Sequence, residues 1–318
     1  MKEGEKMQIE KEDRGEVVFK KEIGFLLVHL APLLVFWTGV TTFDWILCIS
    51  LYFIRMFFVT GGYHRYFSHS TYKTSRFVQF LIAYCSQTSL QKGVLHWAAN
   101  HRTHHKHSDT AKDPHSKKIY GFWYSHIGWI VGPDYKETKL NLIKDFAKYP
   151  ELIWLNKFHL IPPLTLLISV FFLGGYVNAS SAGVEITIMS IMSHGLSSLI
   201  IGFFLSTVIL LHGTFSINSL MHMFGKKRYE SNDESKNHLL LALVTLGEGW
   251  HNNHHYYQST VRQGFYWWEI DITYYILKFL SWFGIIWDLK PVPKHIKDSR
   301  NKEEAKKLKL EYSKLNKK

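Results

Sequence analysis

The sequence has only two cysteines, Cys48 and Cys85, among its 318 residues. Both lie in apolar stretches, so we expect buried thiols rather than a disulfide framework or a thiolate metal site. The sequence also lacks the GxGxxG fingerprint of flavin- or nicotinamide-binding folds. Residues 1–22 carry six basic and seven acidic residues and do not have the layout of a signal peptide. These absences argue against a zinc ribbon, a dinucleotide-dependent enzyme and a cleaved secretory leader.

Basic residues are missing from a long central segment. There is no Lys or Arg between Phe158 and Gly225, whereas the 29 residues from Lys290 to Lys318 hold 11 of them against four acidic residues. The whole chain is 46% hydrophobic and carries a net charge of +12. This separation of apolar and basic segments indicates a membrane protein and no nucleic-acid partner. We expect the tail, residues 298–318, to be solvated or disordered; attraction to anionic lipid or to a negatively charged headgroup is the functional alternative.

Four apolar segments approach the roughly 20 residues that cross a bilayer. They cover residues 23–42, 43–59, 160–177 and 189–211. The turn within each pair contains no basic residue, so the positive-inside rule places both turns outside and both termini in the cytoplasm. Arg55 is the only basic residue within these segments. Because it lies near a segment end, we expect it to snorkel to the interface.

The sequence thus predicts an all-α integral membrane protein with one domain. Four transmembrane helices would carry a cytoplasmic cap built from residues 60–158 and 212–297. The stretch 77–91 is short and ends in polar residues, so we expect it to lie at the interface or to be partly buried. The aromatic stretch 267–287 contains acidic and basic residues, so we expect a helix that lies on the membrane or on the cap.

Eight of the 19 histidines fall in three clusters. HRTHHKH and EGWHNNHH share an i, i+3, i+4 spacing, and HRYFSH adds a pair five residues apart. On a helix the i, i+3, i+4 positions lie on one face. Several neutral imidazoles on one face make a poor core and a good metal site. Eight imidazoles exceed the needs of a single zinc site and suffice for two metal ions, but imidazole also binds Fe, Cu and Ni, so the spacing leaves the metal open.

The clusters and their flanks resemble the membrane fatty acid desaturases of the stearoyl-CoA desaturase type. The similar stretches are GGYHRYFSH, NHRTHHKHSDTAKDPH, FSINSLMHMFG and GEGWHNNHH, and the likeness runs from about residue 30 to 290. The WWEID run resembles the bacterial branch of that family. The resemblance implies two iron ions and O₂-dependent insertion of a cis double bond, usually at Δ9, into an acyl chain for which acyl-CoA is the expected carrier. It also implies an active site on the cytoplasmic side of a bacterial inner membrane.

The resemblance assigns ligands position by position. It implies one iron held by His64, His69, His101, His105 and His254. It implies a second held by His104, His222, His251 and His255, with Asn218 reaching that iron through a water. Adjacent His104 and His105 diverge by about 100° around a helix, so each can face a different metal. His64 and His69 would not share a helical face, so a turn or an irregular helix end is expected there, whereas Asn218 and His222 are spaced to share one.

Further residues near the clusters could support the site. His107, His115, Asp109 and Asp113 are candidates to orient the ligand histidines from behind. Trp97 and Trp250 flank two clusters and could either line an acyl tunnel or simply pack.

The implied reaction needs electrons from outside the chain. The 30 residues after Asp288 are too few for a fused cytochrome domain, so we expect a separate donor of the ferredoxin, rubredoxin or cytochrome b5 type with its reductase. A fatty acyl hydroxylase or another di-iron lipid oxidation on the same core is the nearest alternative and would add oxygen to the product. A membrane metal-binding or transport protein would place its polar ligands within the spans, whereas the clusters lie outside the predicted ones.

Overall fold

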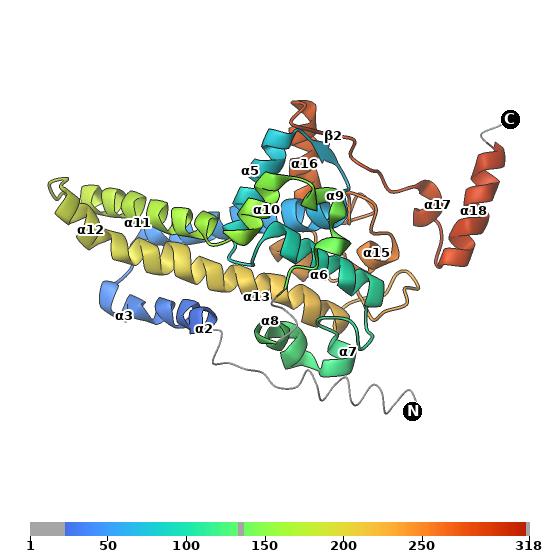
Figure 1. Cartoon of the computed structure of the whole chain (residues 1–318), viewed down its shortest axis with the longest axis horizontal. Coiled ribbons are helices and arrows are strands. Elements are labelled where there is room, and N and C mark those ends of the chain that lie inside the picture. Colours follow the sequence, from blue (N-terminus) through green and yellow to red (C-terminus); the bar gives the residue numbers. More distant parts are fainter. Residues whose placement is uncertain (1–22, 133–136, 316–318) are drawn as a thin grey trace.

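A computed structural model describes residues 23–132 and 137–315 of the chain. These residues are mostly helical (Figure 1). Their one sheet is a short antiparallel pair, β1 (Lys73–Thr74) with β2 (Ile286–Trp287), in which Lys73 lies opposite Trp287. This pair ties the segment after the first histidine cluster to the end of the chain.

Three helices in the described part of the chain are long and apolar enough to cross a membrane. The first is α4 (Thr42–Phe57) continued by the π-helix η3 (Phe58–Ser68), and the second is α11 (Ile161–Ser181). The third is a continuous rod of four parts, α12 (Ile188–Ser197), η7 (Ser198–Leu205), α13 (Ser206–Ser219) and η8 (Leu220–His222). They pack together and extend to one side of the molecule, where the α11–α12 turn lies farthest from the other helices (Figure 1).

The first predicted span, residues 23–42, forms a shorter apolar helix, Ile23–Thr38. It consists of α2 (Ile23–Leu30), η2 (Ala31–Leu34) and α3 (Val35–Thr38), and Pro32 stands in the tighter central turn. Sixteen residues of helix reach about 24 Å, less than the roughly 30 Å of a hydrocarbon core. A fourth crossing therefore stays a prediction.

Two of the other predicted spans continue past their expected ends. The helix expected over 43–59 runs to Ser68, because the backbone passes into a π-helix after Phe57 instead of ending. The helix expected over 189–211 runs to His222. Residues assigned by sequence to the cap thus belong to the same rods as the spans. The first rod carries His64 of the HRYFSH cluster near its end, and the second ends at the candidate ligand His222.

The expectation that Arg55 snorkels to the membrane interface is wrong. Its side chain is only 1% exposed and lies between two long helices. Its guanidinium donates to the hydroxyls of Ser206 and Thr207 and to the carbonyl oxygen of Leu51. Hydroxyl groups on α13 supply the acceptors that water would otherwise provide, so the charge stays inside the helix bundle.

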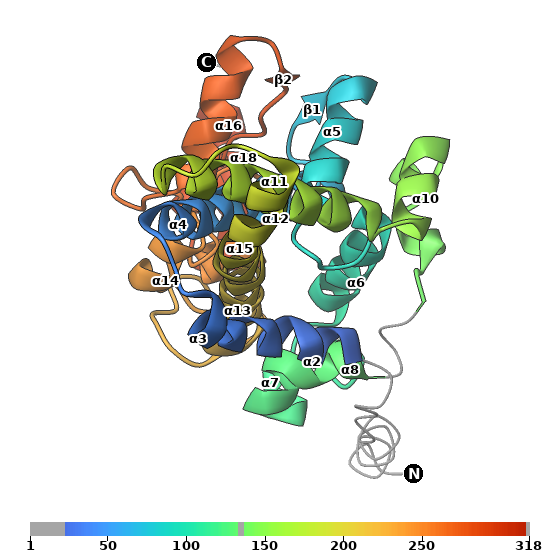
Figure 2. The same ribbon diagram turned by 90° about the vertical axis from the view of Figure 1, so that its left-hand side faces the viewer.

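The remaining elements form a block around one end of the long helices (Figures 1 and 2). They are α5 (Arg76–Gln87), α6 (Val94–His107), α7 (Lys117–Tyr120), η4 (Tyr124–Gly128), α8 (Trp129–Val131), η6 (Leu140–Leu142), α9 (Lys144–Ala147), α10 (Pro150–Lys157), α14 (Leu239–Val244), α15 (His251–Tyr256), α16 (Ile272–Trp282), α17 (Lys294–Lys297) and α18 (Lys302–Leu315). The largest apolar core lies among η3, α5, α6 and α10. Helices α5 and α16, from the two stretches expected at the interface, have 12 and 11 residues, too few to cross a bilayer.

The basic tail is helical where the structure describes it. Helix α18 covers Lys302–Leu315, and Ala305 packs into a cluster of buried side chains. The expected tail was solvated or disordered: these residues are helical and not disordered, and most of their side chains are exposed, as in a solvated tail. Residues 316–318 lie outside the described part of the chain.

Candidate metal centre

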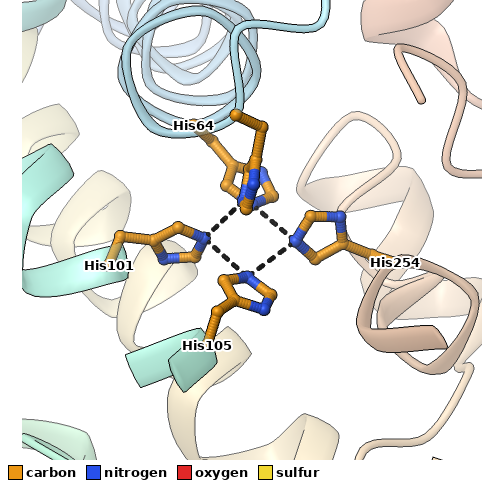
Figure 3. Close-up of side chains that lie close together, drawn as sticks. His64, His101, His105 and His254 are labelled. Carbon is orange, nitrogen blue, oxygen red and sulfur yellow. Dashed lines mark hydrogen bonds between the residues drawn. The ribbon is translucent and has the colours of Figure 1, made fainter. Parts of the chain in front are cut away.

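Five histidines from three separate segments point their Nε2 atoms at one point. They are His64, His69, His101, His105 and His254. Figure 3 shows the rings of His64, His101, His105 and His254 around this point. Neighbouring Nε2 atoms are 3.0 Å apart between His64 and His254, and 2.9 Å apart between His69 and His101. The pairs His101–His105 and His105–His254 are also 2.9 Å apart.

These separations fit a bound metal ion. Metal–imidazole bonds are about 2.1 Å long, so two ligands at a right angle lie about 3.0 Å apart. A ring nitrogen can donate or accept only one hydrogen bond in the ring plane, so five converging nitrogens cannot satisfy one another without a cation. All five imidazoles are buried or half-buried. The first pocket therefore has the donor set and the spacing of a metal site.

A second group lies beside the first and contains His104, His222, His251 and His255. The Nε2 atoms of His104 and His255 are 3.4 Å apart, and those of His222 and His251 are 3.2 Å apart. The rings of His105 and His255, one from each group, have centroids 4.6 Å apart. Two neighbouring pockets of imidazole nitrogen suit a pair of metal ions.

The helices explain how the two groups share residues. Helix α6 carries His101 and His105 toward the first group and turns the adjacent His104 toward the second. Helix α15 likewise sends His254 to the first group and His255 to the second. At the end of η3 the His69 backbone N–H donates to the carbonyl oxygen of His64, an i to i−5 bond that brings the two rings together edge to face, with centroids 4.9 Å apart. The expected irregular helix end at this pair is confirmed.

Carboxylates lie behind four of these histidines, close enough to bind the outer nitrogen in three of them and farther away in His222. The Nδ1 atom lies 2.5 Å from Glu248 in His64, 2.9 Å from Asp113 in His104, 2.6 Å from Asp233 in His255 and 3.5 Å from Asp109 in His222. A carboxylate behind an imidazole fixes the ring orientation and leaves Nε2 free to bind the metal. Asp109 and Asp113 were expected in this role from sequence. Sequence reasoning missed Glu248 and Asp233. Asp233 is 22 residues from His255 in the chain, so no local pattern links the two. Glu248 lies inside the EGWHNNHH stretch, and its position there was the signal that could have found it.

The electrostatics keep the imidazoles ready to bind a cation. Burial, with repulsion from neighbouring imidazoles, holds the pKa of His69, His101 and His105 well below the usual value, so these rings stay neutral at pH 7. The neutral ring is the form that ligates metal. Burial opposes ionisation of Asp113, but the nearby His104 and His115 outweigh it and lower the pKa of that carboxyl.

The other sequence candidates divide between the site and ordinary packing. Asn218 lies on α13 and lines a cavity beside the centre, but α13 ends at Ser219 and His222 follows in a tighter turn, so the two do not share a regular helix. His115 lies 3.7 Å from Asp113, behind His104. His107 stands half-buried at the end of α6, where its carbonyl accepts from Thr110. The Trp250 indole donates to the carbonyl of Ile270, which favours a packing role.

An apolar cavity of about 330 Å³ adjoins the first pocket. Trp97 stacks on His101 with ring centroids 5.0 Å apart, and both line the cavity. The far walls come from the membrane-side helices, with Phe25 and Val28 on α2 and Leu160 directly before α11. The Trp97 indole donates to Gln91, which in turn donates to Thr214, so the ring is fixed in place. The cavity can hold an apolar chain with one part against the histidines.

Three apolar helices of membrane-spanning length, two histidine groups that could hold metal ions and an adjoining apolar cavity are the features of a membrane protein. The family model described as fatty acid desaturase matches residues 26–281. The chain therefore belongs to the fatty acid desaturase family and is an oxidoreductase.

Curated relatives support this assignment. The chain is 35% identical over 275 residues to an sn-1 stearoyl-lipid 9-desaturase of Synechocystis, covering 85% of this chain and 79% of the relative. It is 30% identical to the enzyme of the same description from Anabaena variabilis, covering 89% of this chain and 98% of the relative. It is 31% identical to an icosanoyl-CoA 5-desaturase of Limnanthes douglasii, covering 83% of this chain and 68% of the relative. The first two relatives are cyanobacterial, in line with the expected likeness to a bacterial branch.

Proposed function

We propose that the protein uses O₂ and two iron ions to insert a cis double bond at the Δ9 position of a saturated acyl chain. The convergence of five Nε2 atoms, with neighbours 2.9–3.0 Å apart, is the observation that supports the metal site most strongly. We assign the first iron to His64, His69, His101, His105 and His254, and the second to His104, His222, His251 and His255, with Asn218 acting through a water. The double-bond position is supported by the relatives described as 9-desaturases.

We further propose that the acyl chain is esterified to a membrane lipid, with acyl-CoA as the alternative. Several relatives are named for lipid-linked substrates, although one is named for an acyl-CoA. The walls of the cavity also support a lipid. Leu26 and Leu27 of α2 are more than half exposed on the face away from the cavity, as is Leu164 at the start of α11. Such faces suit the bilayer, so a lipid-anchored chain would need to move only sideways past these helices.

The protein's own residues bind and orient the substrate. The apolar lining excludes water, and the Trp97 ring fixed by Gln91 presses the chain toward the imidazoles. Orientation of this kind accelerates a reaction by presenting only the reacting carbons to the oxidant. Glu248, Asp113 and Asp233 keep the imidazole rings in position. When bound, the two irons supply the oxidising power for removing two hydrogens from adjacent carbons.

The cellular setting follows from the same proposal. Helices α6 and α15, which carry histidines of both groups, lie away from the α11–α12 turn (Figure 1), and that turn has no basic residue. The positive-inside rule then places the pockets in the cytoplasm and the protein in a bacterial inner membrane. Electrons come from a separate donor protein.

The test is expression in a bacterium that lacks its own desaturase. We expect new monounsaturated fatty acids in extracted lipids, with the double bond located by mass spectrometry of dimethyl disulfide adducts. The His104→Ala variant should produce none. Purified protein should convert stearoyl phospholipid in vesicles faster than stearoyl-CoA. A hydroxylated product would instead support the hydroxylase alternative, and preference for stearoyl-CoA would overturn the lipid substrate.

A further inference from the structure

A cluster of aromatic side chains lies directly behind α15, on the side away from the cavity. Its buried members are Tyr229, Tyr256 and Phe265, and Tyr266 packs against them. Tyr256 is the last residue of α15 and follows the candidate ligand His255 in the chain. This places the inner end of the cluster one peptide bond from the second metal group.

The aromatic rings form a path from α15 to the surface. Tyr256 stacks on Tyr229 with centroids 4.4 Å apart and planes 3° from parallel. The hydroxyls of Tyr229 and Tyr266 both donate to the carbonyl oxygen of Lys297, at 3.3 and 2.9 Å. Tyr266 then stacks on Trp268, with centroids 4.7 Å apart. The two stacked pairs, Tyr256 with Tyr229 and Tyr266 with Trp268, are therefore joined through the carbonyl oxygen of Lys297 and not by a ring contact.

The outer end of the path is exposed and the aromatic cluster adjoins a basic segment, while Arg228 beside Tyr266 is ion-paired with Glu269 at 2.8 Å. Trp267 is 81% exposed and Trp268 is 51% exposed. Arg228 covers the Tyr266 ring with its guanidinium 4.6 Å from the centroid, and its side chain is one-third exposed. The basic segment from Lys290 onward holds 11 Lys or Arg against four acidic residues, and its helices α17 and α18 adjoin the cluster through Ile296 and Ala305.

The helices that adjoin the aromatic cluster lie far from the α11–α12 turn. Helices α15, α17 and α18 stand at the opposite end of the molecule from the α11–α12 turn (Figure 1). Exposed tryptophans and an arginine, rimmed by charge, have the composition of the centre of a protein–protein interface. A surface of positive charge draws an acidic partner from solution.

The proposed reaction requires such a partner to supply electrons. A saturated CH₂–CH₂ pair loses two hydrogens and O₂ becomes two waters, so two electrons and two protons have to be added. The protons can come from solvent. The electrons need a donor, which a one-electron carrier supplies in two successive visits.

We propose that Trp267, Trp268 and Arg228 form the docking surface for an acidic one-electron carrier protein, and that the rings from Trp268 to Tyr256 provide a tunnelling route to the metal pair. This rests on the proposed function, because only an oxidase that takes electrons from outside needs such a surface. The rings are not oxidised or reduced; they fill the space between carrier and α15 with closely packed conjugated groups.

The docking test uses a purified plant-type [2Fe–2S] ferredoxin as the acidic probe and the full chain in detergent. We expect Trp268→Ala and Arg228→Gln each to weaken the Kd for ferredoxin about tenfold, as central interface residues do. Raising the salt from about 0.05 to 0.3 M should weaken wild-type binding, because the attraction is electrostatic. The control is Trp123→Ala, an equally bulky residue that is 75% exposed elsewhere on the protein, and it should bind normally.

A second measurement separates docking from conduction. Tyr229→Leu should slow the oxidation of reduced ferredoxin by the iron-loaded protein at least tenfold in stopped flow, with iron content and Kd unchanged. Tyr229→Phe, which keeps the ring, should restore the rate.

Several outcomes would overturn the docking surface or the route. Unchanged Kd in Trp268→Ala, or equal loss in Trp123→Ala, would remove the docking surface. The fluorescence of Trp268 is the part of the wild-type signal that the Trp268→Ala variant lacks. If brominated lipid quenches that part, the ring lies in the bilayer instead. An unaltered transfer rate in Tyr229→Leu would remove the route. If wild-type cells make the unsaturated lipid while these variants behave normally, only this inference fails and the proposed function stands.

Discussion

At the residue scale, His222 and Asp233 show that the second metal group depends on side chains outside the three histidine clusters. His222 stands alone in a short turn after α13, with its Nε2 3.2 Å from that of His251. Without His222 the second group would retain only three imidazoles. Asp233 comes from a loop and orients His255 from behind. Each residue supports a separate prediction.

Replacing His222 should empty the second pocket. We expect His222→Ala to lose activity and to reduce bound iron from two ions to about one per chain, because three imidazoles hold a metal more weakly than four. Asn218→Ala should keep both ions and lose much of the rate, since the imidazole shell survives. Iron analysis of the purified protein checks both results. Met223→Ala, one residue further on, is the control, and a His222→Ala protein with full iron and activity would show that the ninth ligand is elsewhere.

Removing the charge behind His255 should weaken the metal without emptying the site. Asp233→Asn keeps the shape of the side chain but lowers the basicity of the imidazole, which typically costs about 10–100-fold in metal affinity. Competition between the protein and a chelator of known affinity measures this loss. The exposed Glu230→Gln in the same loop should have no effect. Equal affinities for all three proteins would contradict a supporting role for Asp233.

At the element scale, the π-helix η3 is what allows His64 and His69 to meet. A regular helix would direct residues five apart to different sides, whereas the wider turn brings their rings together edge to face. Two glycines precede His64, and only one of them packs closely. A Cβ at Gly62 would collide with Ser86 Oγ and lie 2.9 Å from Ile82 Cγ2, so α5 packs directly against the backbone there.

Adding one methyl group at Gly62 should therefore disturb the first pocket. We expect Gly62→Ala to cost about 1–3 kcal/mol of stability through overpacking and to shift His64 away from its partners. Gly61→Ala is the matched control, because its Cβ would come no closer than 3.4 Å to Phe57. Thermal unfolding in detergent and metal binding of the two variants give the comparison. Identical behaviour of the two would mean that η3 has room to adjust.

At the scale of the whole molecule, the α11–α12 turn and the helices α6 and α15, which carry histidines of both groups, lie toward opposite ends of the long helices (Figure 1). The turn after α11 is exposed and carries no basic residue, whereas the loop after α6 adjoins the second metal group through Asp109 and Asp113. If the proposed orientation holds, these two loops lie on opposite sides of the membrane.

Cysteine labelling of intact cells tests that orientation. In a background with Cys85 replaced by serine, a membrane-impermeant maleimide should label Ala182→Cys from outside. Thr110→Cys, which is exposed in the loop after α6, should react only after the membrane is permeabilised. The native Cys48 is buried and should stay unreactive. Labelling of Thr110→Cys in intact cells would reverse or refute the predicted topology.

The sequence by itself determined the helical class, the apolar segments and the histidines of the three clusters, because these features depend on local periodicity and composition. The irregular helix at His64 and His69 was predictable for the same reason, since their spacing of five does not fit a regular turn. The resemblance to known desaturases added His222 and Asn218, which no local pattern selects. The assignment of all these residues as iron ligands stays a prediction.

Only the tertiary structure decided which groups from distant segments meet. Asp233 approaches His255, and Glu248 approaches His64, through contacts between segments 22 and 184 residues apart in the chain, for which no periodicity gives a signal. Arg55 remains buried because hydroxyls of a helix about 150 residues later meet it, although its place in the sequence suggested escape to the interface. The aromatic path from α15 to Trp268 likewise joins rings from three segments. Such contacts depend on how whole helices pack, and packing is a property of the folded chain rather than of any stretch within it.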